Sequence, residues 1–193
     1  MAASFALVAA SRVQRSAWLV DLDLRRNSAW RGFDEGFAEK VGRPGRPYDA
    51  SLKTEPIYQV TPRPIAVEGE RKGDKLLTVH EIEGTHLLVT RFRNEQLRRG
   101  QRVQIRTQPA WWSALRKIAD WIVVDAPSIE RSPAGLAMAS QMDGVVIVVE
   151  ADSTSAEDVV GLRRELEAYG GHVVGIAMNR VRGDARFADR LSG

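Results

Sequence analysis

The chain contains no cysteine, and this absence excludes two classes of protein. Without cysteine, neither a disulfide scaffold nor a metal site built on thiolates can form. The 193 residues also contain no G-x-x-x-x-G-K-S/T sequence, the motif of a phosphate-binding loop. No G-x-S-x-G sequence is present either, which argues against a hydrolase with a nucleophile elbow. The three histidines, at positions 80, 86 and 172, show no metal-ligand spacing.

Long apolar segments and a strong net charge are also missing. No apolar run approaches the ~20 residues of a membrane-spanning helix, so the sequence predicts no transmembrane segment. Its first residues lack the basic region of a signal peptide and instead predict an amphipathic helix that ends near Arg15. The formal net charge is only +3, so binding to polyanions is neither required nor excluded.

Five short runs have the composition of strands that are buried on both faces. They are rich in Val, Ile and Leu and are continuous rather than alternating, which predicts parallel strands covered by helices. The runs are 17–21, 87–90, 121–125, 145–149 and 173–178. Helical segments at 134–142 and 155–169 lie between the later runs. The predicted class is α/β, with a mostly parallel β-sheet flanked by helices.

The helix at 155–169 carries signals at both ends. Thr154 and Glu157 have the spacing of a capping box, in which each side chain binds a backbone N–H of the other residue. Gly170 and Gly171 then tolerate the left-handed angles that end a helix.

We predict a single nucleotide-binding-like α/β domain over residues 1–193. It is interrupted at about 42–74 by a segment rich in proline and glycine, with little periodicity. This segment predicts a long irregular excursion, with a short extended stretch at 57–60.

Acidic side chains stand at the ends of two of the apolar runs. Asp21 and Asp23 are two residues apart, so in a strand they point to the same face, and Asp125 ends a separate run. Ligands of parallel sheets bind at this carboxyl edge, and acids there often hold Mg²⁺ directly or through water. A solvated strand end with a local Asp–Arg pair explains each acid equally well. Because two separate strands end in acids, a shared metal site is favoured over the chance occurrence of two solvated strand ends.

Four strings resemble the bacterial tyrosine kinases that regulate capsule and exopolysaccharide export, a family within the phosphate-loop ATPase superfamily. Val20-Asp21-Leu22-Asp23-Leu24-Arg25 matches the family's apolar run followed by D-x-D-x-R. The other strings, which the wider superfamily shares, are 120–127, 142–149 and 174–181. The resemblance covers residues 5–40 and 86–182. It implies a phosphate-loop NTPase-like fold of the deviant partitioning-ATPase type.

The resemblance also implies roles for particular residues. Asp21 and Asp125 would be the Mg²⁺-side acids, and Asp23 and Arg25 would assist catalysis at the same motif. The nucleotide-binding residues would be Asn179 and Arg180 at the base, together with Pro127. The cofactors that the resemblance implies are Mg²⁺ and ATP, with no cofactor in this form as the alternative.

The sequence departs from the family in three ways. The family's phosphate loop lies roughly twenty residues before D-x-D, which falls at or before Met1, so we expect an N-terminally incomplete fold. No tyrosine follows Tyr169, whereas such kinases end in a tyrosine cluster. Ala126 stands where the family more often has threonine.

These observations predict a tyrosine kinase-like protein that is inactive or weakened as written. It would be cytoplasmic and held peripherally at the inner membrane by a membrane polysaccharide co-polymerase or export protein. Homo- or hetero-oligomers are compatible with this interpretation. The alternatives are a non-enzymatic adaptor of the export complex, or a partitioning-type ATPase that binds DNA or membrane.

An arginine-rich segment bears on these alternatives. Its six arginines are offset by a single acid, Glu95; they are Arg91, Arg93, Arg98, Arg99, Arg102 and Arg106. A solvated basic surface, an acidic partner and anionic lipid headgroups all fit this pattern. Only Phe92 is interleaved for base stacking, so we do not expect nucleic acid as a partner.

Overall fold

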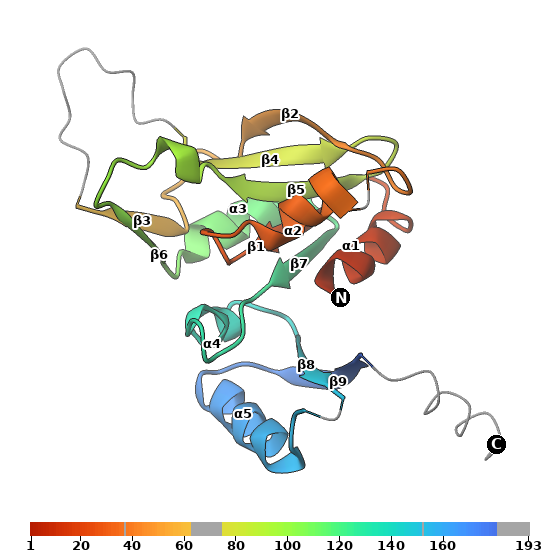
Figure 1. Ribbon diagram of the computed structural model, residues 1–193, viewed down its shortest axis with the longest axis vertical. Helices are drawn as coiled ribbons and strands as arrows, with labels where there is room; N and C mark the ends of the chain where they lie inside the picture. Colours follow the sequence, from red (N-terminus) through yellow and green to blue (C-terminus); the bar gives the residue numbers. More distant parts are fainter. Residues whose placement is uncertain (37, 63–74, 152, 181–193) are drawn as a thin grey trace. The chain divides into compact units, whose positions relative to one another are not determined.

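The computed structural model describes residues 1–36, 38–62, 75–151 and 153–180. The chain divides into two compact units, Met1–Ala134 and Gly135–Gly193, and each is described by itself. Helices and strands occur in both, so the fold is mixed α/β (Figure 1). The expectation of one domain over residues 1–193 stays a prediction.

A five-stranded sheet forms the centre of the first unit. Its strands are β1 (Ala17–Asp21), β2 (Pro44–Asp49), β4 (Leu77–Ile82), β5 (Leu87–Phe92) and β7 (Trp121–Asp125), in the order β2-β4-β5-β1-β7. Strand β1 is parallel to both of its neighbours, β5 and β7. Strand β4 runs antiparallel to β5 and to β2.

The prediction of a mostly parallel sheet is therefore wrong for this unit, whose sheet is mixed. The cause is the short connection between β4 and β5, in which Gly84 has a φ of +75°. Such a connection can join only antiparallel strands, because a parallel crossover needs a dozen residues or more. Strand β2 also lies inside the segment at 42–74 that was expected to be irregular.

Helix α1 (Ala2–Ala10) covers one face of this sheet. Its buried residues Ala6, Ala9 and Ala10 pack in one apolar core with Leu19 of β1 and Val89 of β5. The small alanine side chains bring the helix close to the strands.

Helix α1 ends earlier than expected, before Arg15. The backbone N–H groups of Gln14 and Arg15 are donated to the carboxylate of Asp120, at 3.2 and 2.8 Å, instead of to helix carbonyls. The Arg15 guanidinium completes this contact, with 2.6 Å between its Nε and Asp120 Oδ1.

The remaining elements of the first unit are short. They are α2 (Ser28–Arg31), the π-helical turn η1 (Gly32–Gly36), β3 (Tyr58–Thr61), the 3₁₀ turn η2 (Asn94–Gln96), β6 (Arg102–Ile105) and α3 (Pro109–Ile118). Strands β3 and β6 form a separate antiparallel pair, and β3 is the predicted extended stretch. Residues 63–74 of the predicted excursion lie outside the described residues. Trp111 and Trp112 of α3 are fully buried, whereas Trp121 of β7 is 50% exposed.

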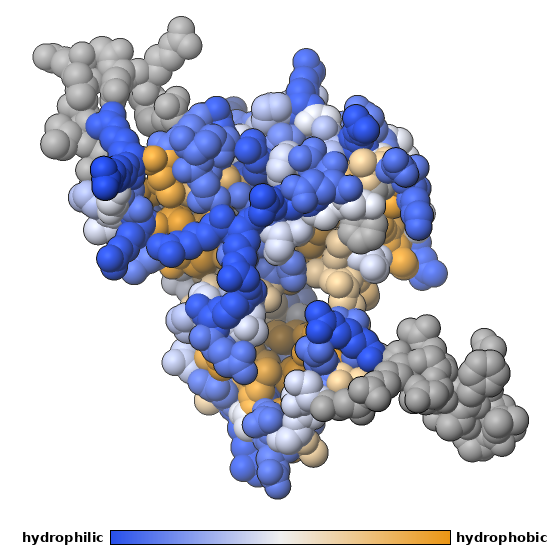
Figure 2. Space-filling model, in the orientation of Figure 1, coloured by the Kyte–Doolittle hydropathy of each residue, from blue (hydrophilic) through white to orange (hydrophobic). Residues whose placement is uncertain are grey.

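The second unit contains a parallel pair of strands and two helices. Strands β8 (Val145–Glu150) and β9 (Val173–Asn179) pair in parallel, as the sequence predicts. Helices α4 (Ala134–Ala139) and α5 (Ala156–Ala168) supply Leu136, Ala139 and Leu166 to the core of this unit. Alternate apolar side chains of both strands are exposed; they are Val146, Val148, Val174, Ile176 and Met178. Figure 2 shows apolar patches between hydrophilic residues on the surface.

The ends of α5 confirm one sequence signal and correct the other. The capping box forms between Ser155 and Asp158, one residue later than the predicted pair. Asp158 donates its N–H to Ser155 Oγ at 3.1 Å, and Ser155 donates its N–H back to the carboxylate at 3.2 Å. Gly170, with a φ of +77°, ends the helix as expected. Among the described residues, none of the helices has the length and apolarity that crossing a bilayer requires.

Candidate functional site

The predicted acids of the first unit come together at one edge of the sheet. Asp21 and Asp125 are register partners at the carboxyl ends of the parallel strands β1 and β7. The ladder continues one step further, where Leu22 donates its N–H to the carbonyl of Asp125 at 2.9 Å. Asp23 follows directly on β1, so three carboxylates lie at this edge.

Asp21 is held by the backbone around it. The residue is 2% exposed, and its two carboxylate oxygens accept the N–H groups of Asp23 and Ala29, each at 2.8 Å. Its own N–H is donated to Thr90 Oγ1 at 3.0 Å. An aspartate that binds backbone two residues ahead is a common organiser of turns. Asp21 thus fixes the path of the chain from β1 into α2.

Burial sets the protonation of both strand-end acids. Desolvation raises the pKa of Asp21 to about 6. Hydrogen bonds from the N–H groups of Ala29 and Asp23 lower this pKa, whereas the negative charges of Asp125 and Asp23 raise it further. Desolvation also raises the pKa of Asp125; Asp23 adds to this, and the amino terminus and Arg131 oppose it. Neighbouring buried carboxylates gain most from a cation, which would lower both pKa values.

Asp125 faces a cavity that the start of α1 also lines. The cavity has a volume of about 200 Å³; it is bordered by residues 1–4, Ser28, Ala29, Gly32 and Asp125. Among the described residues, nothing donates a hydrogen bond to the carboxylate of Asp125. The first N–H groups of a helix have no partner within it and carry partial positive charge, so they attract anions. Carboxylate and helix terminus together offer ligands for a cation and for an anion.

The other predicted residues of this unit have different surroundings. Asp23 forms an ion pair with Arg131, with 3.4 Å between the guanidinium and the carboxylate. Arg25 is exposed, and its carbonyl accepts the side-chain N–H of Asn94 at 2.9 Å. Pro127 is half-buried just beyond β7.

Sequence reasoning missed the residues that brace the loop after β1. Asn27 is buried with a φ of +50° and binds Phe92 twice, through Nδ2 to the carbonyl at 2.9 Å and through Oδ1 to the N–H at 2.6 Å. Asn94 binds the carbonyl of Leu24 at 2.7 Å. Asparagine tolerates left-handed angles, which was the only local signal. The partners are about 65 residues away in the chain, so only the fold identifies them.

Asn179 and Arg180 lie in the second unit, at the end of β9. Asn179 Oδ1 accepts the N–H of Arg180 at 3.0 Å, and Arg180 has a φ of +56°. The Arg180 guanidinium pairs with Glu150 at the end of β8, at 2.6 Å. Their geometry is fixed within this unit only, so their role at a nucleotide base stays a prediction.

The acids of the first unit suit one kind of metal. Over the parts of the chain that the structure describes, no group of three or more His, Asp or Glu side chains is arranged as metal ligands. Mg²⁺ does not need such a cage, because it is often bound by one or two carboxylates together with water and phosphate oxygens. The hard oxygen donors of Asp21 and Asp125 fit this chemistry.

One arginine of the arginine-rich segment packs against the rest of the first unit. Arg91 pairs with Glu95 at 3.0 Å, and its guanidinium lies 4.5 Å from the ring centre of Trp30. Arg102 and Arg106 are exposed. At least one arginine of the run therefore contributes to packing, and the acidic, lipid or nucleic-acid partner of the others stays a prediction.

Comparison with known proteins gives matches among solved structures only. No protein-family model and no curated protein matches the chain. A crystal structure of the VpsO kinase domain matches with a TM-score of 0.50 and 17% sequence identity, covering 94% of this chain and 75% of that one. At this identity the similarity concerns the fold. The chain therefore has a mixed α/β fold similar to that of a kinase domain.

Proposed function

We propose that the protein is a bacterial tyrosine kinase-like protein of exopolysaccharide or capsule biosynthesis and export. The supporting observation is the pairing of Asp21 with Asp125 next to the start of α1, in a fold similar to a kinase domain. Carboxylates can hold Mg²⁺ against the phosphates of ATP, and helix N–H groups can accept phosphate oxygens.

Each residue has a proposed role in that site. Asp21 and Asp125 hold Mg²⁺ directly or through water, and the fixed carboxylate of Asp21 orients the site. Asp23 and Arg25 assist at the same edge, and Pro127 contacts the nucleotide. A role for Asn179 and Arg180 of the second unit toward the nucleotide base is proposed from the sequence resemblance alone. When bound, Mg²⁺ neutralises charge on the phosphoryl group that is transferred to tyrosine.

The affinity for nucleotide should be low in the 193 residues. They contain no glycine-rich phosphate loop, whose backbone N–H groups supply much of the binding in kinases of this type. We expect Mg·ATP to bind no tighter than millimolar, about 4 kcal/mol. The protein would then be inactive or weakly active as written.

One observation favours a second candidate, a non-enzymatic adaptor of the export complex. Both oxygens of Asp21 are occupied by backbone N–H groups, and Asp23 is paired with Arg131. Acids committed in this way can serve the fold alone. The adaptor would bind the cytoplasmic segment of a membrane polysaccharide co-polymerase and lie peripherally at the inner membrane.

Calorimetric titration with Mg·ATP, combined with NMR mapping, tests the proposal. Millimolar binding with shifts confined to the ends of β1 and β7 and the start of α1 supports the kinase-like site. Micromolar binding would contradict the weakened form. If Mg·ATP shifts no signal at these residues, while the chain binds a cytoplasmic segment of a co-polymerase, the protein is an adaptor and not a kinase-like protein.

A further inference from the structure

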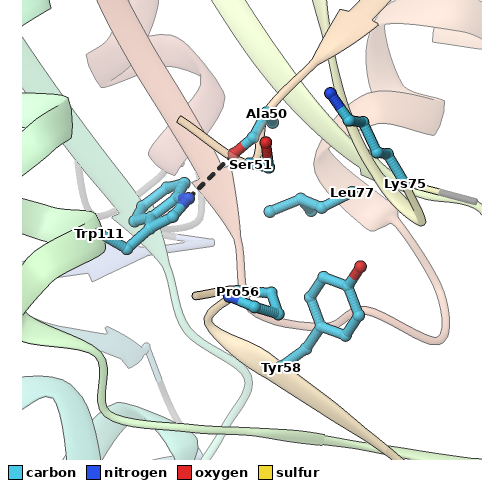
Figure 3. Close-up of a pocket in the computed structure, with 7 residues that line it drawn as sticks. All are labelled: Ala50, Ser51, Pro56, Tyr58, Lys75, Leu77 and Trp111. Atoms are coloured by element: carbon cyan, nitrogen blue, oxygen red, sulfur yellow. Dashed lines mark hydrogen bonds between the residues drawn. The ribbon is translucent and has the colours of Figure 1, made fainter. Parts of the chain in front are cut away.

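A second cavity lies in the first unit and shares no lining residue with the one beside Asp125. Its volume is about 180 Å³, and residues from four separate segments surround it. Figure 3 shows Trp111 on one side of this space, Tyr58 and Lys75 on the other, and Pro56 between Trp111 and Tyr58. The remaining lining residues are Ala50, Ser51 and Leu77.

The walls of this cavity are apolar and held in place. Trp111 is fully buried, and its indole N–H is donated to the carbonyl of Ala50 at 2.9 Å. Trp111 also packs edge-on against Trp112, with 4.8 Å between ring centres. Tyr58 packs in the same way on Phe92 at 5.0 Å. An apolar cavity of about 150 Å³ is sufficient to bind benzene, so this one has room for a single ring.

Ser51 and Lys75 are polar residues that line the cavity, and both bind Asp49, which does not itself line it. Lys75 forms an ion pair with Asp49, and Ser51 donates its hydroxyl to the same carboxylate at 2.8 Å. Burial alone would raise the pKa of Asp49, but the hydrogen bonds from Lys75 and Ser51 outweigh it and hold the pKa below its usual value. The Lys75 side chain is 59% exposed, so the end of the cavity that Lys75 lines is open to solvent.

The charges at this end determine which ligand fits. A carboxylate entering the cavity would meet the charge of Asp49, and an ammonium group would meet that of Lys75. An uncharged hydroxyl avoids both conflicts, because it accepts from one of the three N–H donors of Lys75 and donates to a carboxylate oxygen. A ring that carries a hydroxyl therefore suits both the walls and the open end.

We propose that this cavity binds a phenol ring. The ring lies next to Pro56 between Trp111 and Tyr58, and its hydroxyl reaches Lys75, beside the ion pair of Lys75 with Asp49. The acids at the ends of β1 and β7 take no part in this site, so its test is independent of the proposed kinase-like function.

NMR titration of the ¹⁵N-labelled chain with p-cresol tests the proposal. The indole N–H signal of Trp111 should shift and saturate, because the bound ring lies next to this buried lining residue. Toluene has the same ring and methyl group but no hydroxyl, and it should bind about tenfold more weakly. An unshifted Trp111 signal, or equal affinity for toluene and p-cresol, would overturn the proposal.

Two variants locate the site. Lys75→Met removes the donor at the open end and should weaken p-cresol binding about tenfold, whereas Lys117→Met, at an exposed lysine of α3, should not change it. Leu77→Phe fills the cavity and should abolish binding while far-UV circular dichroism stays native. If Leu77→Phe unfolds the chain, the comparison of Lys75→Met with Lys117→Met alone tests the proposal. Equal affinities of the two lysine variants would contradict the proposal.

Two further probes distinguish a tyrosine side chain from a small free phenol as the ligand. N-acetyl-tyrosinamide binding at least as tightly as p-cresol assigns the cavity to a tyrosine side chain of a polypeptide. Binding of p-cresol alone assigns it to a small free phenol. N-acetyl-phenylalaninamide binding as tightly as the tyrosine compound would contradict phenol recognition.

Discussion

The ends of β1 and β7 lie side by side and carry the same residue, yet the two aspartates have opposite surroundings. Both oxygens of Asp21 accept backbone N–H groups at 2.8 Å. The carboxylate of Asp125 accepts no hydrogen bond from any described residue and borders a cavity instead. Asp21 thus stabilises the chain around it in addition to its proposed role, whereas Asp125 is available to a ligand alone.

The segments that follow the two strands differ in the same way. The loop after β1 is fixed by Asp21, Asn27 and Asn94, all of which bind backbone groups. Beyond β7, Ala126 and Ser128 are exposed. The backbone there forms local turns, such as the one in which Arg131 donates its N–H to the carbonyl of Ser128 at 3.0 Å. A braced loop next to an open one is a reasonable arrangement for a site that must admit a ligand.

The largest effect on the free energy of unfolding should come from truncating Asp21, in contrast to Asp125. Asp21→Ala leaves the N–H groups of Asp23 and Ala29 without their acceptor, and each buried unsatisfied group costs about 1–3 kcal/mol. We expect a loss of about 3–5 kcal/mol in the free energy of unfolding, measured by urea denaturation. Asp125→Ala should change it by less than about 1 kcal/mol, because no hydrogen bond is lost. Equal losses in the two variants would remove the distinction between the acids.

The pH dependence of stability should identify Asp21 next. Its pKa is about 6 in the folded state, against an ordinary value near 3.8, so the folded state holds the proton more strongly than the unfolded state. The stability contribution is complete below pH 3.8 and is lost as the pH rises to about 6. We expect wild type to lose on the order of 2–3 kcal/mol over this window relative to Asp21→Asn. Parallel pH profiles would show that the carboxyl group titrates normally.

Truncation of Asn27 should have a smaller effect on the braced loop. Asn27→Ala removes two hydrogen bonds to Phe92 and places alanine at a left-handed angle. We expect a loss of about 2 kcal/mol in the free energy of unfolding. Asn27→Gly relieves the backbone strain and isolates the hydrogen bonds. A loss below about 0.5 kcal/mol in both variants would show that the loop does not depend on this residue.

The smallest effect should come from the ion pair that links the two segments. Arg131 and Asp23 are separated by 3.4 Å, and the arginine side chain is 44% exposed. Arg131→Gln should therefore change stability by less than about 1 kcal/mol, checked by thermal unfolding at low and high salt. A larger, salt-insensitive loss would mean that this contact braces the end of β7 as firmly as Asp21 braces β1.

The sequence predicted the parts of this arrangement that depend on local composition. The apolar runs that became β1, β7, β8 and β9 are continuous, and acids at parallel strand ends must approach one another. Strand β4 escaped prediction because Thr78 and His80 are polar but buried. The Thr78 hydroxyl donates to the carbonyl of Arg91 at 3.1 Å, and His80 Nδ1 lies 2.8 Å from the carbonyl oxygen of Gly45. Such partners belong to other strands, so no local pattern reveals them.

The most direct test of the account is paramagnetic line broadening by Mn²⁺, which prefers the same oxygen ligands as Mg²⁺. Backbone signals at the end of β7 and the start of α1 should broaden first. Asp125→Asn should abolish this broadening, whereas Glu157→Gln, at an exposed acid of α5, should leave it unchanged. Broadening centred elsewhere, or unaffected by Asp125→Asn, would contradict the claim that these strand ends form a cation and phosphate site.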